Sequence, residues 1–307
     1  MELESLPNEL LLDIFRFLNI FQLVDAFCNL NIRFNQLLFS YYQAYHLSFQ
    51  FLSKHDCTRM CQDYLPMIIH RIISLYLSNE EETPYLTELF FSHDFKLNQF
   101  KQLQSLSLCY IYSFDLLNEI LLQCHDLPNL IHLKIIKCHR TLAEKNLALI
   151  NHVWNLRKLV SCNLYYINSY SQTLSVGITI STPVSLSITH LTIEDVETTL
   201  KDLSDLCQHT PNLRRLSISI VCKSENEQLP TMIPSIISLN ISFVGTRNSM
   251  INLFENMPNL SSLTLNTCPI YLNGHEWEEI IRKHLPKIQR FRLRMYFQFP
   301  YDDNRQK

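Results

Sequence analysis

The pattern of apolar residues along the chain contains a short motif that recurs. The pattern Leu-x-x-Leu-x-Leu, in which Ile is also allowed, occupies 130–135, 213–218 and 260–265, each time directly after a Pro-Asn pair. From Ile72 to Ile288, eight intervals between such copies average 27 residues. Self-similarity at a fixed period indicates a repeat architecture. The first apolar positions of the nine copies are Ile72, Leu103, Leu130, Leu156, Ile188, Leu213, Ile236, Leu260 and Ile288.

The segments between the copies have a different period. Residues 113–124 place Leu116, Leu117, Ile120 and Leu121 at helical spacing, and comparable patterns occur in 141–153, 195–207, 248–257 and 276–285. Short strands that alternate with helices predict parallel strands joined by crossover helices. We therefore expect an α/β fold of stacked repeats, each burying about three aliphatic side chains against its neighbours. The copy at Leu156 is imperfect, because it places Ser161 at the third apolar position.

The first fifty residues contain no such string. A helix is predicted to begin near Pro7, with Glu9 in its first turn and apolar residues at positions 10, 11, 14, 15, 17 and 18. Two more short helices are expected, around 23–28 and 32–42. The apolar stripe of the first helix is wider than one core-facing side requires. Because three short helices bury little surface alone, the spare apolar face implies a partner, either the next domain or another protein.

These N-terminal residues resemble a known family. The string Leu6-Pro7-x-Glu9-Leu10-Leu11-x-x-Ile14-Phe15-x-Phe17-Leu18, followed by Leu23 and by Arg33-Phe34-x-x-Leu37, resembles an F-box over roughly residues 3–46, although the run 28–31 departs from the family pattern. The resemblance implies docking onto a Skp-type adaptor and, through it, a cullin–RING ubiquitin ligase. It implies adaptor contacts by Leu6, Pro7, Leu10, Leu11, Ile14, Phe15, Leu18 and Leu23.

The repeats resemble leucine-rich repeats, whose units span ~20–29 residues. The combined resemblance implies an α/β protein with a short three-helix F-box followed by a curved solenoid, with a concave face of parallel strands and helices on the convex face. The expected domains are 1–46 (F-box), 47–71 (a connecting segment that could hold one more degenerate repeat), 72–299 (the repeat array) and 300–307 (a flexible tail). The alternative is that the N-terminal helices only cap the array.

Residues that alternate with the buried strand positions would face the concave side and meet a protein target. Most of them are small and polar, which suits protein recognition and not catalysis. The arginines at 290, 292 and 294 could bind an acidic or phosphorylated segment, or could simply place charge on an exposed terminal strand. The predicted target-binding residues are His132, Lys134, Lys158, His190, Glu194, Arg215, Arg290, Arg292 and Arg294.

Composition narrows the possible chemistry. The chain has three glycines among 307 residues, so clustered-glycine phosphate loops and nucleophile elbows cannot be assembled. The net charge of -3 gives no reason to expect nucleic acid as a partner. No apolar run reaches the ~18 residues of a membrane span, and the acidic N-terminus lacks the features of a signal peptide. The ten scattered cysteines are expected to be reduced thiols in a cytoplasmic or nuclear protein.

Candidate chemical motifs are incomplete. His55, Asp56, Cys57 and Cys61 could form half of a zinc site, but no second pair of ligands follows at a useful spacing. Cysteines 124, 138 and 268 are expected in the core. No metal, cofactor or catalytic residue is predicted. The sequence thus favours a non-catalytic substrate receptor of a Skp–cullin–F-box ubiquitin ligase; the alternative is a leucine-rich-repeat interaction or inhibitor scaffold.

Overall fold

The computed structural model describes residues 3–41, 45–138, 143–165, 183–222, 224 and 227–296. The predicted tail, 300–307, and the end of the third predicted helix lie outside these residues. The chain divides into two compact units, 1–141 and 142–307, which we describe separately. Within the described ranges, no helix is both long enough and apolar enough to cross a membrane.

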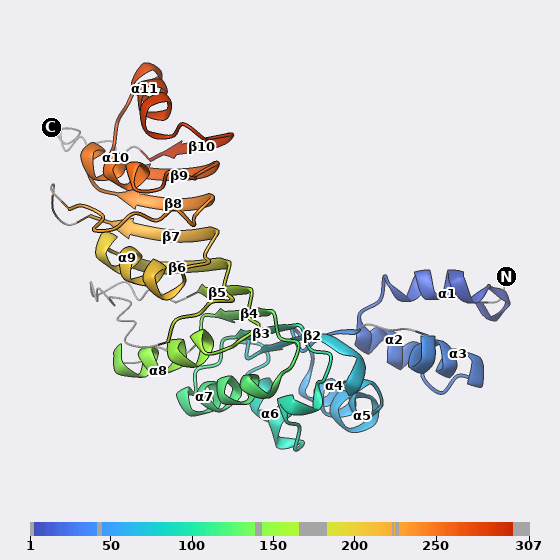
Figure 1. The fold of residues 1–307 in the computed structure, drawn as a ribbon. Helices are drawn as coiled ribbons and strands as arrows, with labels where there is room; N and C mark the ends of the chain where they lie inside the picture. The colour runs from blue at the N-terminus through green and yellow to red at the C-terminus, as the bar shows by residue number, and fades with distance from the viewer. Residues whose placement is uncertain are drawn as a thin grey trace, which may run out of the picture. The chain divides into compact units, whose positions relative to one another are not determined.

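Unit 1 begins with three short helices, as the sequence predicted (Figure 1). Pro7 is the N-cap residue of the first, and the side chains of Asn19 and Asn31 cap the other two. Asn19 forms a full capping box: its Oδ1 accepts from the backbone N–H of Gln22, and its own backbone N–H donates to Gln22 Oε1. The elements are a 3-10 turn at Leu3–Ser5, α1 (Asn8–Phe15), α2 (Ile20–Phe27) and α3 (Ile32–Gln36), which continues into a π-helical turn at Leu37–Tyr41.

Four parallel strands follow among the described residues of unit 1, each paired with the next along the chain. They are β1 (Tyr45–Ser48), β2 (Ile72–Ser78), β3 (Ser105–Cys109) and β4 (His132–Ile136). Because β1 begins at Tyr45, the first strand starts before the segment 47–71. The helices between the strands are α4 (Lys54–Arg59), a π-helical turn at Met60–Tyr64, α5 (Leu65–Ile68), α6 (Leu86–Ser92) and α7 (Phe114–Gln123), with 3-10 turns at Ile69–Arg71, Leu97–Gln99 and Cys124–Asp126.

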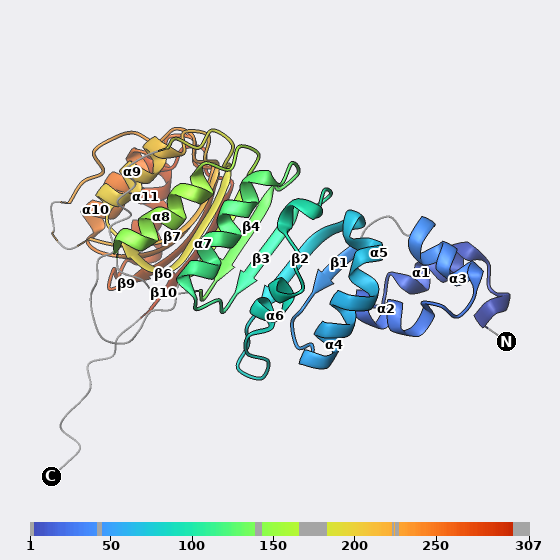
Figure 2. The same cartoon turned by 90° about the horizontal axis from the view of Figure 1, so that it is seen from below.

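The described residues of unit 2 form six further strands, again parallel and paired in chain order. The strands are β5 (Ser161–Tyr165), β6 (His190–Thr198), β7 (Arg215–Val221), β8 (Ser238–Val244), β9 (Ser262–Cys268) and β10 (Arg290–Met295). The helices are α8 (Ala143–Trp154), α9 (Leu200–His209), α10 (Arg247–Glu255) and α11 (Gly274–His284). In each unit the helices cover one face of the strands and leave the other face open (Figure 2).

The recurring apolar positions form the core between the strands and the helices. Leu216, Leu239 and Leu263 are register partners on β7, β8 and β9, and all three are buried. Since side chains alternate along a strand, the residues directly before and after each of these leucines point to the open face. This arrangement confirms the predicted α/β class with parallel strands and crossover helices.

One repeat is set differently from the sequence-based alignment. Ser161 pairs with His190, which makes Leu159, and not Leu156, the first apolar position of its copy. Cys162 and Leu164 then occupy the next two apolar positions, and both are buried. The intervals from Leu130 to Leu159 and from Leu159 to Ile188 are both 29 residues. The imperfect copy is therefore regular once a cysteine is accepted as a small apolar residue.

The Pro-Asn pairs have a structural role of their own. Asn129 Nδ2 donates to the backbone carbonyl of Lys101 at 2.9 Å, and Asn212 and Asn259 donate in the same way to Leu186 and Pro234, each at 2.8 Å. Each acceptor lies in the corresponding turn of the preceding repeat. The asparagines therefore join consecutive turns in front of the strands, and satisfy carbonyls that the strand ladder does not reach.

The cysteines are all free thiols, and most are buried. Cys124 and Cys138 lie in the core as expected, whereas Cys268 is half-buried. Burial raises the pKa of Cys124 and of Cys138 to about 12, so both thiols are neutral near pH 7. Such cysteines act as small apolar side chains and not as nucleophiles.

Candidate functional site

The N-terminal helices share a small apolar core. Leu11 and Phe15 of α1 are both 0% exposed, and Leu23 of α2 is also buried. The ring of Phe27 lies between those of Phe15 and Phe34, with centroid distances of 4.9 Å and 5.3 Å. These side chains hold the three helices against one another.

Arg33 of α3 forms hydrogen bonds with the segment that leads into α1. Its guanidinium donates to Asn8 Oδ1 at 2.9 Å and to the backbone carbonyls of Glu4 and Leu6, both at 2.5 Å. Asn31 Nδ2 donates to Glu4 Oε1 at 2.9 Å beside it. The segment before α1 is therefore held in place by charge-assisted hydrogen bonds.

Large apolar side chains remain exposed on these helices. Leu10 on α1 is 50% exposed, Phe17 in the turn after α1 is 88% exposed, and Ile32 at the start of α3 is 79% exposed. Leu3 and Leu30 are exposed as well, and lie next in sequence to Glu4 and Asn31, which bond to each other. We call these five residues the N-terminal apolar set. Water-exposed leucine, isoleucine and phenylalanine side chains gathered on one small helical region are typical of a binding site.

The eight residues of the implied adaptor contact differ in how far their side chains are exposed. Leu11, Phe15 and Leu23 are core residues, so their side chains support the helices and are not available at the surface. Leu6, Ile14 and Leu18 are half-buried, while Pro7 and Leu10 are exposed. The motif alone could not make this distinction, because apolar residues at helical spacing satisfy a core and a contact surface equally well. Phe17, Ile32, Leu30 and Leu3 are exposed residues that the implied contact did not include.

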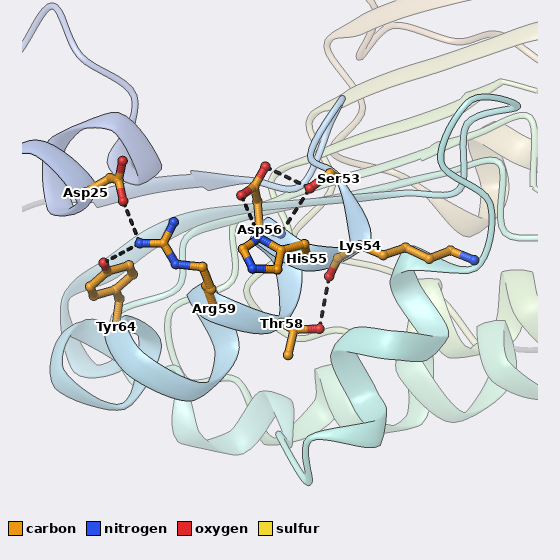
Figure 3. Close-up of polar contacts among 8 residues, drawn as sticks. All are labelled: Asp25, Ser53, Lys54, His55, Asp56, Thr58, Arg59 and Tyr64. Atoms are coloured by element: carbon orange, nitrogen blue, oxygen red, sulfur yellow. Dashed lines mark hydrogen bonds and ion pairs between the residues drawn. The ribbon is translucent and has the colours of Figure 1, made fainter.

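Arg59 connects the N-terminal helices to the first repeat (Figure 3). Its Nη2 atom lies 2.6 Å from Asp25 Oδ1 on α2 and 3.2 Å from the hydroxyl of Tyr64. The guanidinium carbon is also 5.8 Å from the ring centroid of Phe21 and 6.0 Å from that of Tyr64. These partners, the Asp25 carboxylate first among them, raise the pKa of Arg59, which stays charged. Both side chains of the ion pair are partly exposed, so its contribution is to orientation more than to stability.

The incomplete zinc-like motif at 55–61 begins with a helix cap (Figure 3). Ser53 Oγ accepts from the backbone N–H of Asp56 at 3.1 Å and donates to its carboxylate at 2.8 Å. His55 Nδ1 is 3.4 Å from the same carboxylate, while the Cys57 side chain is buried. In the described ranges, no group of three or more His, Cys, Asp or Glu side chains is placed to hold a metal ion.

The predicted target-binding residues fall in both units. His132 and Lys134 on β4 of unit 1 are exposed on the open face, opposite Ser105 and Ser107 of β3. In unit 2, the register brings His190, Arg215 and Arg290 into one row that crosses the strands, with Ser238 and Ser262 between the two arginines. Glu194 is exposed near the end of the regular part of β6.

Lys158 is the exception. It lies in the turn before β5, at the place that Asn129 takes before β4, and not on the strand. Its predicted position followed from aligning the repeat on Leu156. With the repeat aligned on Leu159, Ser161 and Asn163 take the open-face positions of β5.

The arginines of β10 are all exposed. Arg290, Arg292 and Arg294 are register partners of Ser262, Thr264 and Asn266 on β9. Among the described residues, the structure shows no hydrogen bond or ion pair of these three guanidinium groups. Taken together, exposed apolar side chains on the N-terminal helices and polar open faces on the strands are suited to binding other molecules.

A scan against protein-family models found no match to the chain, and a search of curated proteins found none either.

Proposed function

We propose that the protein is a non-catalytic substrate receptor of a Skp–cullin–F-box ubiquitin ligase. The observation that carries the proposal is the N-terminal apolar set, where Phe17 and Ile32 are 88% and 79% exposed in a segment whose sequence resembles an F-box. Fully burying such a side chain contributes roughly 1.5–3 kcal/mol, so a few of them can supply most of the affinity for an adaptor.

The open faces of the strands would bind the target. Their residues are mainly Ser, Thr, Asn, Arg and His, which donate and accept hydrogen bonds without demanding a deep pocket. The protein would act by holding a target close to the ubiquitin-charged enzyme, which raises the effective concentration of the target. No covalent step is assigned to the chain.

The ion pair between the N-terminal helices and the first repeat supports this mechanism. Arg59 and Asp25 join α4 to α2 within unit 1, so an adaptor bound to the helices would be held in a defined orientation to the first repeats. A receptor needs such an orientation, because transfer to a target depends on distance and geometry.

Capture of a purified Skp-type adaptor tests the proposal. We expect the full chain to retain the adaptor, and the variant Leu10→Ala/Phe17→Ala/Ile32→Ala to lose at least about tenfold in affinity. The matched control is Leu186→Ala/Met232→Ala, which removes exposed apolar side chains from loops of unit 2. Equal retention by the wild type and the triple variant, or no retention by either, would leave the scaffold alternative, in which the helices only cap the repeats.

A further inference from the structure

The last described strand is incompletely covered on its apolar side. Phe291, Leu293 and Met295 of β10 are half-buried, whereas their register partners on β9, Leu263, Leu265 and Thr267, are buried. Trp277 of α11 approaches Phe291, with a centroid distance of 5.7 Å. Among the described residues, β10 pairs with β9 alone, so the backbone groups along its other edge have no strand partner there.

The open side of the same strand is strongly cationic. Arg290, Arg292 and Arg294 alternate along β10, and successive guanidinium groups therefore start from positions about 6.6 Å apart, twice the rise per residue. Arg215 adds a fourth positive charge in the row of Arg290. No carboxylate occupies an open-face position on β7 to β10: the remaining positions are Ser217, Ser219, Val221, Ser238, Asn240, Ser242, Val244, Ser262, Thr264, Asn266 and Cys268.

We propose that β10 is a docking edge for an extended segment of a protein target in which acidic and apolar residues alternate. This inference rests on the proposed function in one respect, since it names the class of target. The segment adds a strand beside β10 and pairs with the backbone groups that face away from β9. Its acidic side chains, spaced like the arginines, face Arg290, Arg292 and Arg294, while its apolar side chains cover Phe291, Leu293 and Met295.

The alternation follows from strand geometry. Neighbouring strands in a sheet place their side chains on the same face at each register position, so a partner of β10 must reproduce its two-residue period. Opposite charges directly across a strand pair stabilise it, and apolar side chains on the other face complete the core of the last repeat. A segment with consecutive acidic residues would place half of its charges against Phe291 and Leu293.

A long polyanion such as a nucleic acid fits this surface less well. The strand before β7 carries Glu194, Asp195 and Glu197, all exposed, so the cationic region ends there. A continuous phosphate backbone that crossed β10 to β7 would next meet these carboxylates, whereas a single extended segment lying along β10 would not. The observations therefore favour one acidic strand.

Fluorescence anisotropy with synthetic peptides tests the proposal on the full-length protein. The probe is a fluorescein-labelled peptide in which glutamates alternate with valines. A second peptide has the same composition with its glutamates consecutive, and a third has proline in place of the central valine. We expect the alternating peptide to bind at least about tenfold more tightly than either, because only it can match the arginines and keep the backbone pairing.

Charge reversal supplies the second arm. We expect Arg290→Glu/Arg292→Glu to abolish binding of the alternating peptide and to gain binding of a peptide with lysines in place of the glutamates. The control Arg282→Glu/Lys283→Glu makes the same charge change on the exposed side of α11 and should leave the affinity within about twofold. Equal binding of the alternating and consecutive peptides, tighter binding of an oligothymidylate, or no binding of the alternating peptide would each overturn the inference.

The two proposals fail separately. Adaptor capture is measured on the same preparations, and Arg290→Glu/Arg292→Glu should retain the adaptor as the wild type does. If the wild-type protein captures the adaptor but does not bind the alternating peptide, only the docking edge is contradicted. Peptide binding without adaptor capture would contradict only the proposed function.

Discussion

Arg59 of α4 and Asp25 of α2 form an ion pair, with Nη2 2.6 Å from Oδ1, between residues that lie 34 positions apart in the sequence. It joins the N-terminal helices to the first repeat at the point where Phe21 and Tyr64 flank the guanidinium. Nothing in the local pattern around either residue indicates the other. The pair links the N-terminal helices to the first repeat within unit 1.

Removal of this pair should loosen the helices without unfolding the repeats. In Arg59→Ala, we expect faster hydrogen exchange in α2, together with unchanged exchange in β2 and β3, because the lost partner anchors α2 alone. Hydrogen exchange measured by mass spectrometry checks this. Arg16→Ala, which breaks an exposed pair with Asp13 inside the first helix region, is the control and should leave α2 unchanged. Equal acceleration in β2 would mean that Arg59 stabilises the whole unit.

Neighbouring leucines in α1 should behave in opposite ways. Leu11→Ala leaves a cavity at a fully buried position and should cost about 2–5 kcal/mol in the stability of the N-terminal helices. Leu10→Ala, at a half-exposed position, should change stability by less than about 0.5 kcal/mol yet weaken adaptor capture. Urea denaturation followed by circular dichroism measures the first effect. Similar destabilisation by both substitutions would contradict the division between core and surface.

The turn asparagines should contribute measurably to stacking. Asn259 donates to the carbonyl of Pro234 at 2.8 Å and accepts from Lys287 Nζ at 2.6 Å, so it joins three consecutive turns. Since both bonds are at the surface, Asn259→Ala should lower the free energy of unfolding by about 1 kcal/mol. Asn248→Ala, on the exposed side of α10, is the control and should be neutral or slightly stabilising. If the two variants have the same free energy of unfolding in urea, the hydrogen bonds of Asn259 do not stabilise the stacking of the repeats.

Buried thiols should make the protein less stable at high pH. Burial raises the pKa of Cys124 and Cys162 to about 12, while an unfolded thiol ionises near ~8.5. The unfolded state therefore binds fewer protons between these values, and stability should fall as the pH rises above about 9, by at most about 1.4 kcal/mol per pH unit for each thiol.

Two measurements check the thiol prediction. At pH 8, iodoacetamide should modify both cysteines in urea and neither in the native protein. Cys162→Ala should reduce the pH dependence of the unfolding free energy between pH 9 and 10. Rapid modification of Cys162 in the native protein would show that the thiol is accessible.

The sequence predicted most of the repeats, because each buried leucine row leaves a period of two in its strand and each covering helix leaves a period near 3.6. It misaligned one repeat at Leu156, since Cys162 was not counted as apolar and Leu156 lay where a leucine was expected. It also did not predict the hydrogen bonds that the turn asparagines form with the preceding repeat. The hydrogen bond from Asn129 to the carbonyl of Lys101 joins consecutive repeats, and a pattern within one repeat does not record it.

The N-terminal helices show the same division. The order of apolar residues from Leu6 to Leu18 was sufficient to predict helices and a spare apolar face. Only packing decided that Leu11 and Phe15 are enclosed while Phe17 and Ile32 meet water, because burial depends on how three helices close around one another. By itself, then, the sequence determined the repeat period, the α/β class and the resemblance of its first helices to an adaptor-binding motif. The tertiary structure decided which apolar residues remain available, which polar residues share a row and how Arg59 joins the helices to the repeats, since these depend on distances between residues far apart in the chain.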